Sequence, residues 1–204
     1  MIEYVPGKPF HAGVASQLLH ATMGPFADAA LGLGDHAFCL HALQEVFSRP
    51  GNRFSFDRTI MGMAGEEVAA LLIAFPGGEL GGRNWIYLRQ SLSIYGIRKY
   101  LRLLANFILG FTSKECENDE YYIAHLAVSP AFRKQGIARA ILVEAENMAA
   151  RAGLHKISLL VEIGNTPAIT LYQAVGYKMI STIRTPGLEK KFHSPGYHRM
   201  LKLI

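Results

Sequence analysis

The sequence is poor in cysteine and has no long apolar run. Its two cysteines, Cys39 and Cys116, form neither a Cys-x-x-Cys pair nor a Cys/His spacing typical of a metal site. We therefore expect free thiols in a reducing compartment, the cytoplasm, and no bound metal. The most apolar stretch, Tyr100 to Phe111, is interrupted by Arg102 and Asn106, so a transmembrane helix is not expected.

Further absences narrow the class of protein. The first residues show no basic segment followed by an apolar core, so a signal peptide is not expected. The chain has no dense run of lysine and arginine and no aromatic and basic repeat, which argues against a nucleic-acid-binding protein. Its formal net charge is nevertheless +5, which favours an anionic ligand such as a nucleotide or coenzyme A.

Hydrophobic periodicity and turn residues divide the chain into strands and helices. Strands are expected at residues 1–5, 53–62, 67–75, 121–128, 157–163, 177–185 and 197–203. Helices are expected at residues 11–23, 35–48, 137–152 and 166–175, with two more within 83–111 that divide near Gly96. Asp35 and Thr166 are the expected N-caps of their helices, and Gly24-Pro25 is expected to end the first helix.

The clearest functional pattern begins at the strand expected over Tyr121–Val128. Both alternating faces of this strand are apolar, which is typical of a central strand. After Ser129-Pro130, a basic loop containing Gly136 leads into an amphipathic helix. The start of a helix offers unpaired N–H groups and a positive dipole end, and glycine allows a close approach to the backbone. This order of elements therefore predicts a phosphate site.

The same stretch resembles motif A of the GNAT superfamily, the acyl-CoA-dependent N-acyltransferases. The family pattern, Arg/Gln-x-x-Gly-x-Gly/Ala after a central strand, here reads Arg133-x-x-Gly136-x-Ala138. A second stretch, Asn165 to Tyr177, matches the family signature Asn-x-x-Ala-x-x-Leu-Tyr-x-x-x-Gly-Phe/Tyr at all of its fixed positions. The two motifs follow each other in the family's order.

The resemblance is strong over residues 119–185 and rests on the order of elements alone over residues 1–76. It implies an α/β fold, with a mixed, mostly antiparallel, twisted sheet of six or seven strands flanked by helices. A central pair of strands is expected to be parallel. Residues 1–204 are expected to form a single domain, with a helical insertion at about residues 80–112 that departs from the family's usual short link.

The resemblance also implies the site. The basic loop is expected to hold the pyrophosphate of coenzyme A, and the backbone of the central strand its pantetheine arm and the thioester oxygen. The implied cofactor-binding residues are Leu126, Ala127, Val128, Arg133, Lys134, Gln135, Gly136, Ile137, Ala138, Arg139, Asn165 and Tyr172. Tyr172 also occupies the family's position for the general acid. A phenol with a pKa of ~10 is protonated at neutral pH and can therefore donate its proton to the thiolate.

The general base is left open among several residues. Glu162, near the end of its strand, and Tyr122, where some relatives place a catalytic acid or histidine, are the first candidates. Tyr122 cannot be a ready base, but it can hold a water molecule. Further candidates are Glu120, at the start of the central strand, and His125, which strict alternation places on the opposite face of that strand from Tyr122.

The predicted function is therefore an N-acetyltransferase that moves an acetyl group from acetyl-CoA to a primary amine of a small molecule or peptide by direct attack. The alternative is a non-catalytic CoA-binding or regulatory domain of the same fold. A nucleotide site at the glycine-rich stretch Pro76–Gly82 is a weaker alternative, because the usual phosphate-loop pattern is missing there. Neither a nucleic-acid nor a membrane partner is expected, and a homodimer is left open.

Overall fold

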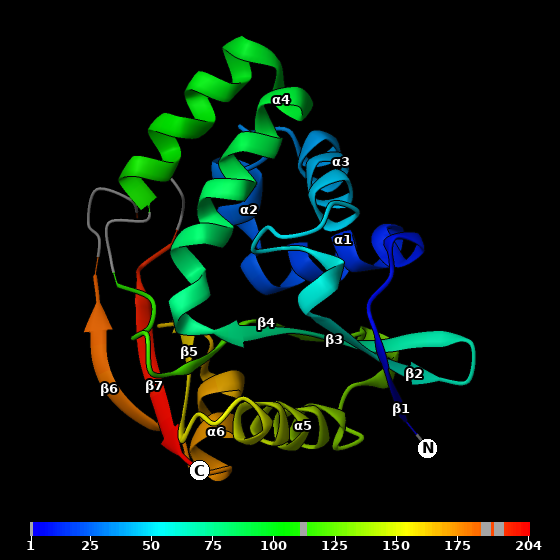
Figure 1. Cartoon of the computed structure of the whole chain (residues 1–204), viewed down its shortest axis with the longest axis vertical. Helices are drawn as coiled ribbons and strands as arrows, with labels where there is room; N and C mark the ends of the chain where they lie inside the picture. Colours follow the sequence, from blue (N-terminus) through cyan, green and yellow to red (C-terminus); the bar gives the residue numbers. More distant parts are fainter. Residues whose placement is uncertain (1, 111–113, 185–188, 190–193) are drawn as a thin grey trace.

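The computed structural model describes residues 2–110, 114–184, 189 and 194–204. Within these residues, seven strands form one twisted, mixed sheet in the order β1-β2-β3-β4-β5-β7-β6 (Figure 1). The strands are β1 (Glu3–Pro6), β2 (Thr59–Ala64), β3 (Glu67–Pro76), β4 (Tyr121–Val128), β5 (Lys156–Glu162), β6 (Lys178–Ile183) and β7 (Tyr197–Leu203). Neighbouring strands are antiparallel except β4 and β5, which are parallel. The expected fold class is confirmed.

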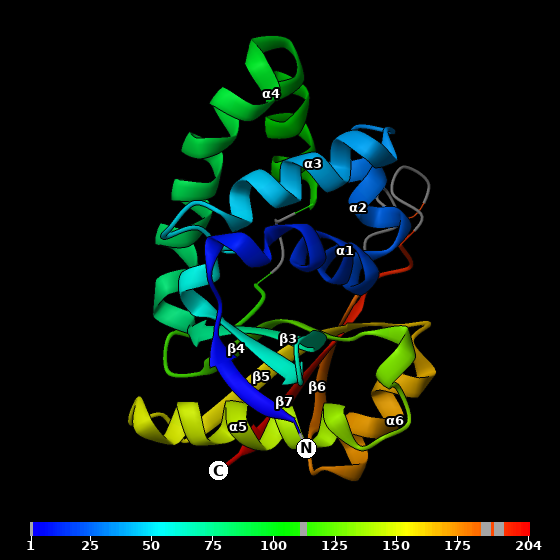
Figure 2. The same cartoon turned by 90° about the vertical axis from the view of Figure 1, so that its right-hand side faces the viewer.

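Helices cover both faces of the sheet. One face carries α1 (Ala12–Met23), α2 (Pro25–Ala30), α3 (His36–Phe47) and α4 (Leu80–Gly110), and the other carries α5 (Ile137–Arg151) and α6 (Thr166–Ala174) (Figures 1 and 2). In the described part of the chain, no helix is both long and apolar enough to cross a membrane. Cys39 and Cys116 are buried free thiols, as expected.

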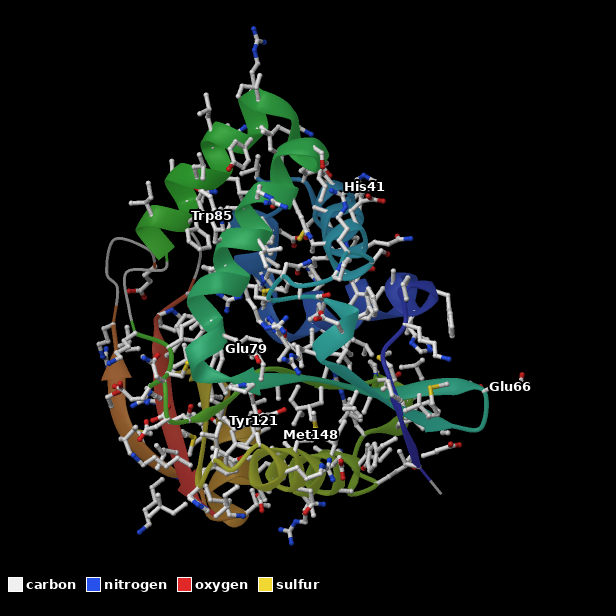
Figure 3. The ribbon with its side chains drawn as sticks, in the orientation of Figure 1. His41, Glu66, Glu79, Trp85, Tyr121 and Met148 are labelled. Atoms are coloured by element: carbon white, nitrogen blue, oxygen red, sulfur yellow. The ribbon has the colours of Figure 1, made fainter. Side chains whose placement is uncertain are left out.

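Strand β4 separates two hydrophobic cores. Tyr122 and Ala127 belong to the core beneath α1, α3 and α4, whereas Tyr121 and Ile123 belong to the core beneath α5 and α6. In Figure 3, Tyr121 lies on the α5 side of the sheet, near Met148. Because β4 buries apolar side chains on both faces, it lies centrally in the sheet, as its sequence predicted.

The helices expected within 83–111 are both part of α4, which has two arms separated by a kink (Figure 1). The kink lies at Gly96, whose φ of +63° is readily adopted by glycine. The Tyr95 hydroxyl donates to the Leu31 carbonyl at 2.9 Å, and the Asn106 amide donates to the Ala30 carbonyl at 3.0 Å. These bonds fix both arms against the end of α2. Trp85 projects from the first arm and is largely exposed (Figure 3).

The strand expected at 53–62 is wrong in its first half, because β2 begins only at Thr59. Residues 53–58 form a loop, ending in a short 3-10 helix at Phe56–Arg58, that the buried Asn52 holds. Its side-chain nitrogen donates to two carbonyls of the preceding turn at 2.7 and 2.9 Å, and its oxygen accepts from the Phe54 N–H at 2.8 Å. These bonds satisfy backbone groups locally, so strand pairing starts later.

Two helix boundaries also differ from expectation. The N-cap of α6 is Asn165, not Thr166, because the Asn165 side-chain oxygen accepts from the Ala168 N–H at 3.2 Å. Gly24 does end α1, but Pro25 then opens α2, which the sequence pattern did not predict. Proline in a first helical turn lacks only an N–H that would have had no partner there.

The expected opposite orientation of Tyr122 and His125 is wrong. The pairing of β4 with β3 shifts register between Ile73 and Ala74, which leaves Ala124 as a bulge. One extra residue reverses the alternation of side chains beyond it. Tyr122 and His125 therefore share the face of the sheet that α1 covers.

Candidate active site

A cleft of about 830 Å³ opens where β4 and β5 part. Their parallel pairing stops after Ile123 and Leu159, so the rest of β4 has no strand beside it on this edge within the described chain. One side of the cleft comes from the ends of α1 and α2 and the loop at Arg53 and Phe54. The other comes from the start of α5 and from α6. The second side contains most of the predicted cofactor residues.

The backbone of β4 points partly into this cleft. The Ser129 N–H donates to the Ala69 carbonyl of β3 at 2.8 Å, and residues of an antiparallel strand alternate between bonding their partner and facing away. Ala127, two residues before Ser129, therefore bonds β3, whereas the N–H groups of Leu126 and Val128 face the cleft. Of the three predicted backbone positions, these two can donate to a ligand in the cleft.

The loop after β4 ends in an anion-binding geometry. Lys134 and Gly136 both have left-handed backbone conformations, with φ of +62° and +78°. Gly136 is the N-cap of α5, whose first N–H groups have no partner within the helix. A Cβ at Gly136 would meet no atom within 4 Å, so the approach to these N–H groups is open. Such a helix start, with Arg133 and Arg139 nearby, suits a phosphate.

Most of the predicted loop residues border the cleft. They are Arg133, Lys134, Gly136, Ile137, Ala138 and Arg139. Gln135 is the exception, because its side chain donates back to the Ala131 carbonyl at 3.4 Å. The rival glycine-rich stretch does not border the cleft. There, a Cβ at Gly77 would lie 2.0 Å from the Glu117 carbonyl oxygen, so that glycine serves close packing.

Tyr172 brings a phenol from α6 to the cleft. Its ring lies 5.8 Å from that of Tyr177 and is 8% exposed. Burial raises the pKa of Tyr172 to about 12, so the phenol keeps its proton across the neutral and mildly alkaline range. The protonated phenol therefore borders the same cleft as Leu126 and Val128 of β4.

The candidate bases occupy different places. Glu162, at the end of β5, borders the cleft. The Tyr122 hydroxyl also borders it but donates to the Glu115 carboxylate at 2.7 Å. Glu120 lies outside the cleft and forms a buried ion pair with Arg199 of β7. Glu162 is therefore the one of these carboxylates that faces the cleft without an ion-pair partner among the described residues.

Sequence reasoning missed Arg53 and Glu115. The terminal nitrogens of Arg53 donate to both oxygens of Glu115, at 2.9 and 2.7 Å. Burial alone would raise the pKa of Glu115, but the Arg53 cation and the Tyr122 hydroxyl hold it below its usual value. The ionised pair thus borders the cleft as a fixed dipole. Both residues lie outside strands and helices and far apart in the chain, so no periodic pattern marked them.

His125 is held in one tautomer. The Thr22 hydroxyl donates its single hydrogen to the Leu19 carbonyl at 2.7 Å, so it accepts from His125 Nδ1 at 2.9 Å. Nε2 then carries the lone pair. Burial, followed by the nearby Arg53 cation, lowers the pKa of His125 to about 3. His125 is therefore neutral and a weak base in this environment.

We expect Asn165→Ala to lower the free energy of unfolding by about 1 kcal/mol, because the cap of α6 is lost. Asn165→Ser keeps an oxygen at the N-cap and should be nearly as stable as the parent. If the Asn165 side chain also contacts coenzyme A, both variants will bind it more weakly. Chemical unfolding and calorimetry separate the two roles. Unchanged CoA affinity in the serine variant would restrict Asn165 to capping.

Comparison with known proteins identifies the family. Residues 56–177 match the model of the acetyltransferase (GNAT) family, which is more than half of the chain. The chain therefore belongs to the GNAT acetyltransferase family.

One curated relative is a [ribosomal protein bS18]-alanine N-acetyltransferase from Haemophilus ducreyi. It is 37% identical over 89 residues, which cover 42% of this chain and 61% of the relative. Solved structures support the fold over nearly the whole chain. An N-acetyltransferase from Staphylococcus aureus Mu50 has a TM-score of 0.70 at 20% identity, with 98% of this chain and 99% of that one covered. Another acetyltransferase has a TM-score of 0.65 at 18% identity, with 99% of each chain covered.

Proposed function

We propose that this chain transfers an acetyl group from acetyl-CoA to a primary amine of a small molecule or peptide, by direct attack of the amine on the thioester. The observation that best supports this is a single cleft bordered by the Gly136 loop, the cleft-facing N–H groups of Leu126 and Val128, and Tyr172. The proposal treats residues 1–204 as one domain, with α4 as its insertion.

Different residues of the cleft have different roles in the reaction. The loop and the start of α5 hold the pyrophosphate, and an N–H of β4 faces the thioester oxygen as negative charge develops there. The neutral amine nitrogen bonds to the carbonyl carbon, the carbon–sulfur bond breaks, and Tyr172 donates its proton to the leaving thiolate. The surplus proton on the new amide nitrogen then returns through water to the Tyr172 oxygen. Glu162 accepts the proton that the ammonium form of the acceptor loses, directly or through water.

The acceptor side of the cleft combines apolar and charged groups. Met23, Phe26 and Phe54 provide apolar surface, and the Arg53–Glu115 pair provides a fixed dipole. This mixture suits an amine attached to a partly apolar group, such as the first residue of a peptide. The curated relative acts on an alanine of a ribosomal protein, which makes a peptide beginning with alanine the first acceptor to test.

The experiment is a measurement of free CoA released from acetyl-CoA with a panel of amines. The panel contains a peptide beginning with alanine, the same peptide with its N-terminus blocked, a polyamine and free amino acids. Amine-dependent CoA release supports the proposal, and loss of release on blocking identifies an N-terminal acceptor. Tight acetyl-CoA binding with no release for any amine would favour the non-catalytic alternative.

We expect acetyl-CoA to raise the melting temperature of the protein, and ATP and NAD to leave it unchanged. A ligand bound only by the folded state stabilises it by about 2.7 kcal/mol at about 100 times its Kd. The β4 backbone groups beyond the phosphate loop fit a pantetheine arm, which ATP and NAD lack. A thermal shift with ATP and none with acetyl-CoA would contradict the site assignment.

A further inference from the structure

A second group of chemically active side chains lies where α1, α2 and α3 meet. It consists of His20 at the end of α1, Asp28 in α2, and His36 and Cys39 in α3. We call these four residues the helix-junction cluster. The described acetyl-transfer site does not use them, because none of the four borders the cleft.

Three of the four side chains converge on a small volume, and His36 joins them through its contact with Asp28. His20 Nε2 and His36 Nδ1 lie 2.9 and 3.0 Å from the same oxygen of Asp28. Ligand atoms of His20, Asp28 and Cys39 all lie within 4.8 Å of one another. Backbone packing holds Cys39 in place, since a Cβ at Gly32 would lie 2.7 Å from the Cys39 Cβ. Cys39 is fully buried, whereas His36 is largely exposed, so the cluster opens to solvent on one side.

We propose that the helix-junction cluster binds a transition-metal ion, of which Zn²⁺ fits best. Two imidazole nitrogens, one carboxylate oxygen and one thiolate form a four-ligand set of the kind that Zn²⁺ binds tetrahedrally. Mg²⁺ and Ca²⁺ prefer oxygen ligands, so the nitrogen and sulfur atoms select against them. Backbone glycine at position 32 brings the sulfur close to the carboxylate.

Metal binding would require side-chain movements, because His36 lies beside Asp28 but outside the three residues whose ligand atoms are within 4.8 Å of one another. Ligand atoms at the corners of a Zn²⁺ tetrahedron are separated by roughly 3.3–3.5 Å when the metal–ligand bonds are about 2.0–2.3 Å. The His–Asp contacts at 2.9 and 3.0 Å would open slightly, and the sulfur would move inward. The exposed His36 side chain has room to rotate.

The charges of the ligands suit a divalent ion held between Asp28 and Cys39. A divalent cation between the two groups would neutralise Asp28 and replace the thiol proton. The ordinary alternative is a network of hydrogen bonds in which both histidines donate to Asp28.

The site has a structural consequence for the cleft. Thr22 and Met23 follow His20 in α1, and Phe26 precedes Asp28 in α2; all three border the acceptor side. A metal ion that joins α1, α2 and α3 would fix this wall without taking part in acetyl transfer. The proposal therefore stands independently of the acceptor's identity.

The test uses Co²⁺ and Zn²⁺ with the full chain, and three variants. Tetrahedral Co²⁺ bound through a thiolate gives a sulfur-to-metal charge-transfer band and intense visible bands. We expect these bands at one equivalent of Co²⁺, and their displacement by Zn²⁺. Cys39→Ser should lose the charge-transfer band, whereas Cys116→Ser, which removes the other buried thiol, should retain it.

Asp28→Asn keeps the size of the side chain but removes its charge, so this variant should retain the fold. Its Zn²⁺ affinity, measured against a competing chelator, should fall by more than the roughly 10–100-fold that loss of an outer-shell partner costs. Zn²⁺ should raise the melting temperature of the parent and of Cys116→Ser, but not of Cys39→Ser. A parent protein without the charge-transfer band, or equal Zn²⁺ affinity in the parent and Asp28→Asn, would leave only the hydrogen-bond network and overturn the proposal.

Discussion

Replacing Tyr172 by phenylalanine should lower kcat by about 10²–10⁴-fold, the usual value of general acid catalysis. The ring still packs against Tyr177, so the fold and acetyl-CoA affinity should change little. The lost proton donor acts on the departing thiolate, mainly in the transition state, and therefore affects kcat more than binding. Steady-state kinetics with a good acceptor, and calorimetry with acetyl-CoA, measure both quantities.

Tyr177→Phe is the matched control. Tyr177 is buried beside Tyr172, its hydroxyl has no hydrogen-bond partner among the described residues, and it does not border the cleft. Its kcat should equal that of the parent. A kcat for Tyr172→Phe within about twofold of the parent would remove Tyr172 from the mechanism, since even modest general acid catalysis exceeds this.

The protonation state of Tyr172 gives a further observable. A pKa of about 12 means that the phenol remains an acid well above the pH at which an ordinary tyrosine ionises. The part of kcat that depends on Tyr172 should therefore stay constant up to about pH 11, one unit below that pKa. A pH profile in which the Tyr172-dependent part of kcat falls with a midpoint near 10 would contradict this environment.

Gly136→Asp should lower the affinity for CoA by at least about 100-fold, because the new carboxylate would meet the pyrophosphate at close range. The new side chain meets no protein atom within 4 Å, so it would project into the open space above the loop. It also places a non-glycine residue at a φ of +78°, which costs about 1–2 kcal/mol of stability. Calorimetry measures the affinity, and thermal unfolding the cost.

Two controls separate charge from strain. Gly136→Asn has nearly the same shape without the charge, so its residual CoA affinity should exceed that of Gly136→Asp. Gly153, at the other end of α5, has a φ of +70° and also open space around it. Gly153→Asp should therefore have a similar stability loss and unchanged CoA affinity. Equal CoA affinity for the parent and a folded Gly136→Asp would make the loop a simple connector.

Local patterns predicted the cofactor half of the molecule well. The apolar strand Tyr121–Val128, the glycine loop and the helix from Ile137 are continuous in sequence, so alternation and helical periodicity describe them directly. The division near Gly96 was also predicted, because glycine readily adopts the positive φ that interrupts a helix, and Gly96 has such a φ in the structure. Which of these residues bind the cofactor stays a prediction.

Features that depend on tertiary pairing were not predicted. The bulge at Ala124 appears only when β4 pairs with β3, and it alone moves His125 to the acceptor side. The Arg53–Glu115 pair joins two loops through space. The helix-junction cluster draws on three helices, so no Cys/His spacing marked it, and the sequence-based expectation of no metal came from spacing alone.

Strand β7 lies between β5 and β6 although it follows both in the chain. During synthesis, β6 therefore emerges before the strand that gives it its sheet contact in the described structure, and it must wait unpaired. The buried carboxylate of Glu120 also lacks its ion-pair partner until then, because that partner is Arg199 of β7. The half of the cleft built on β5 and α6 should thus become rigid late in translation. A nascent chain stalled before residue 197 would resemble a partly folded intermediate with an open sheet edge, the kind of species that chaperones bind.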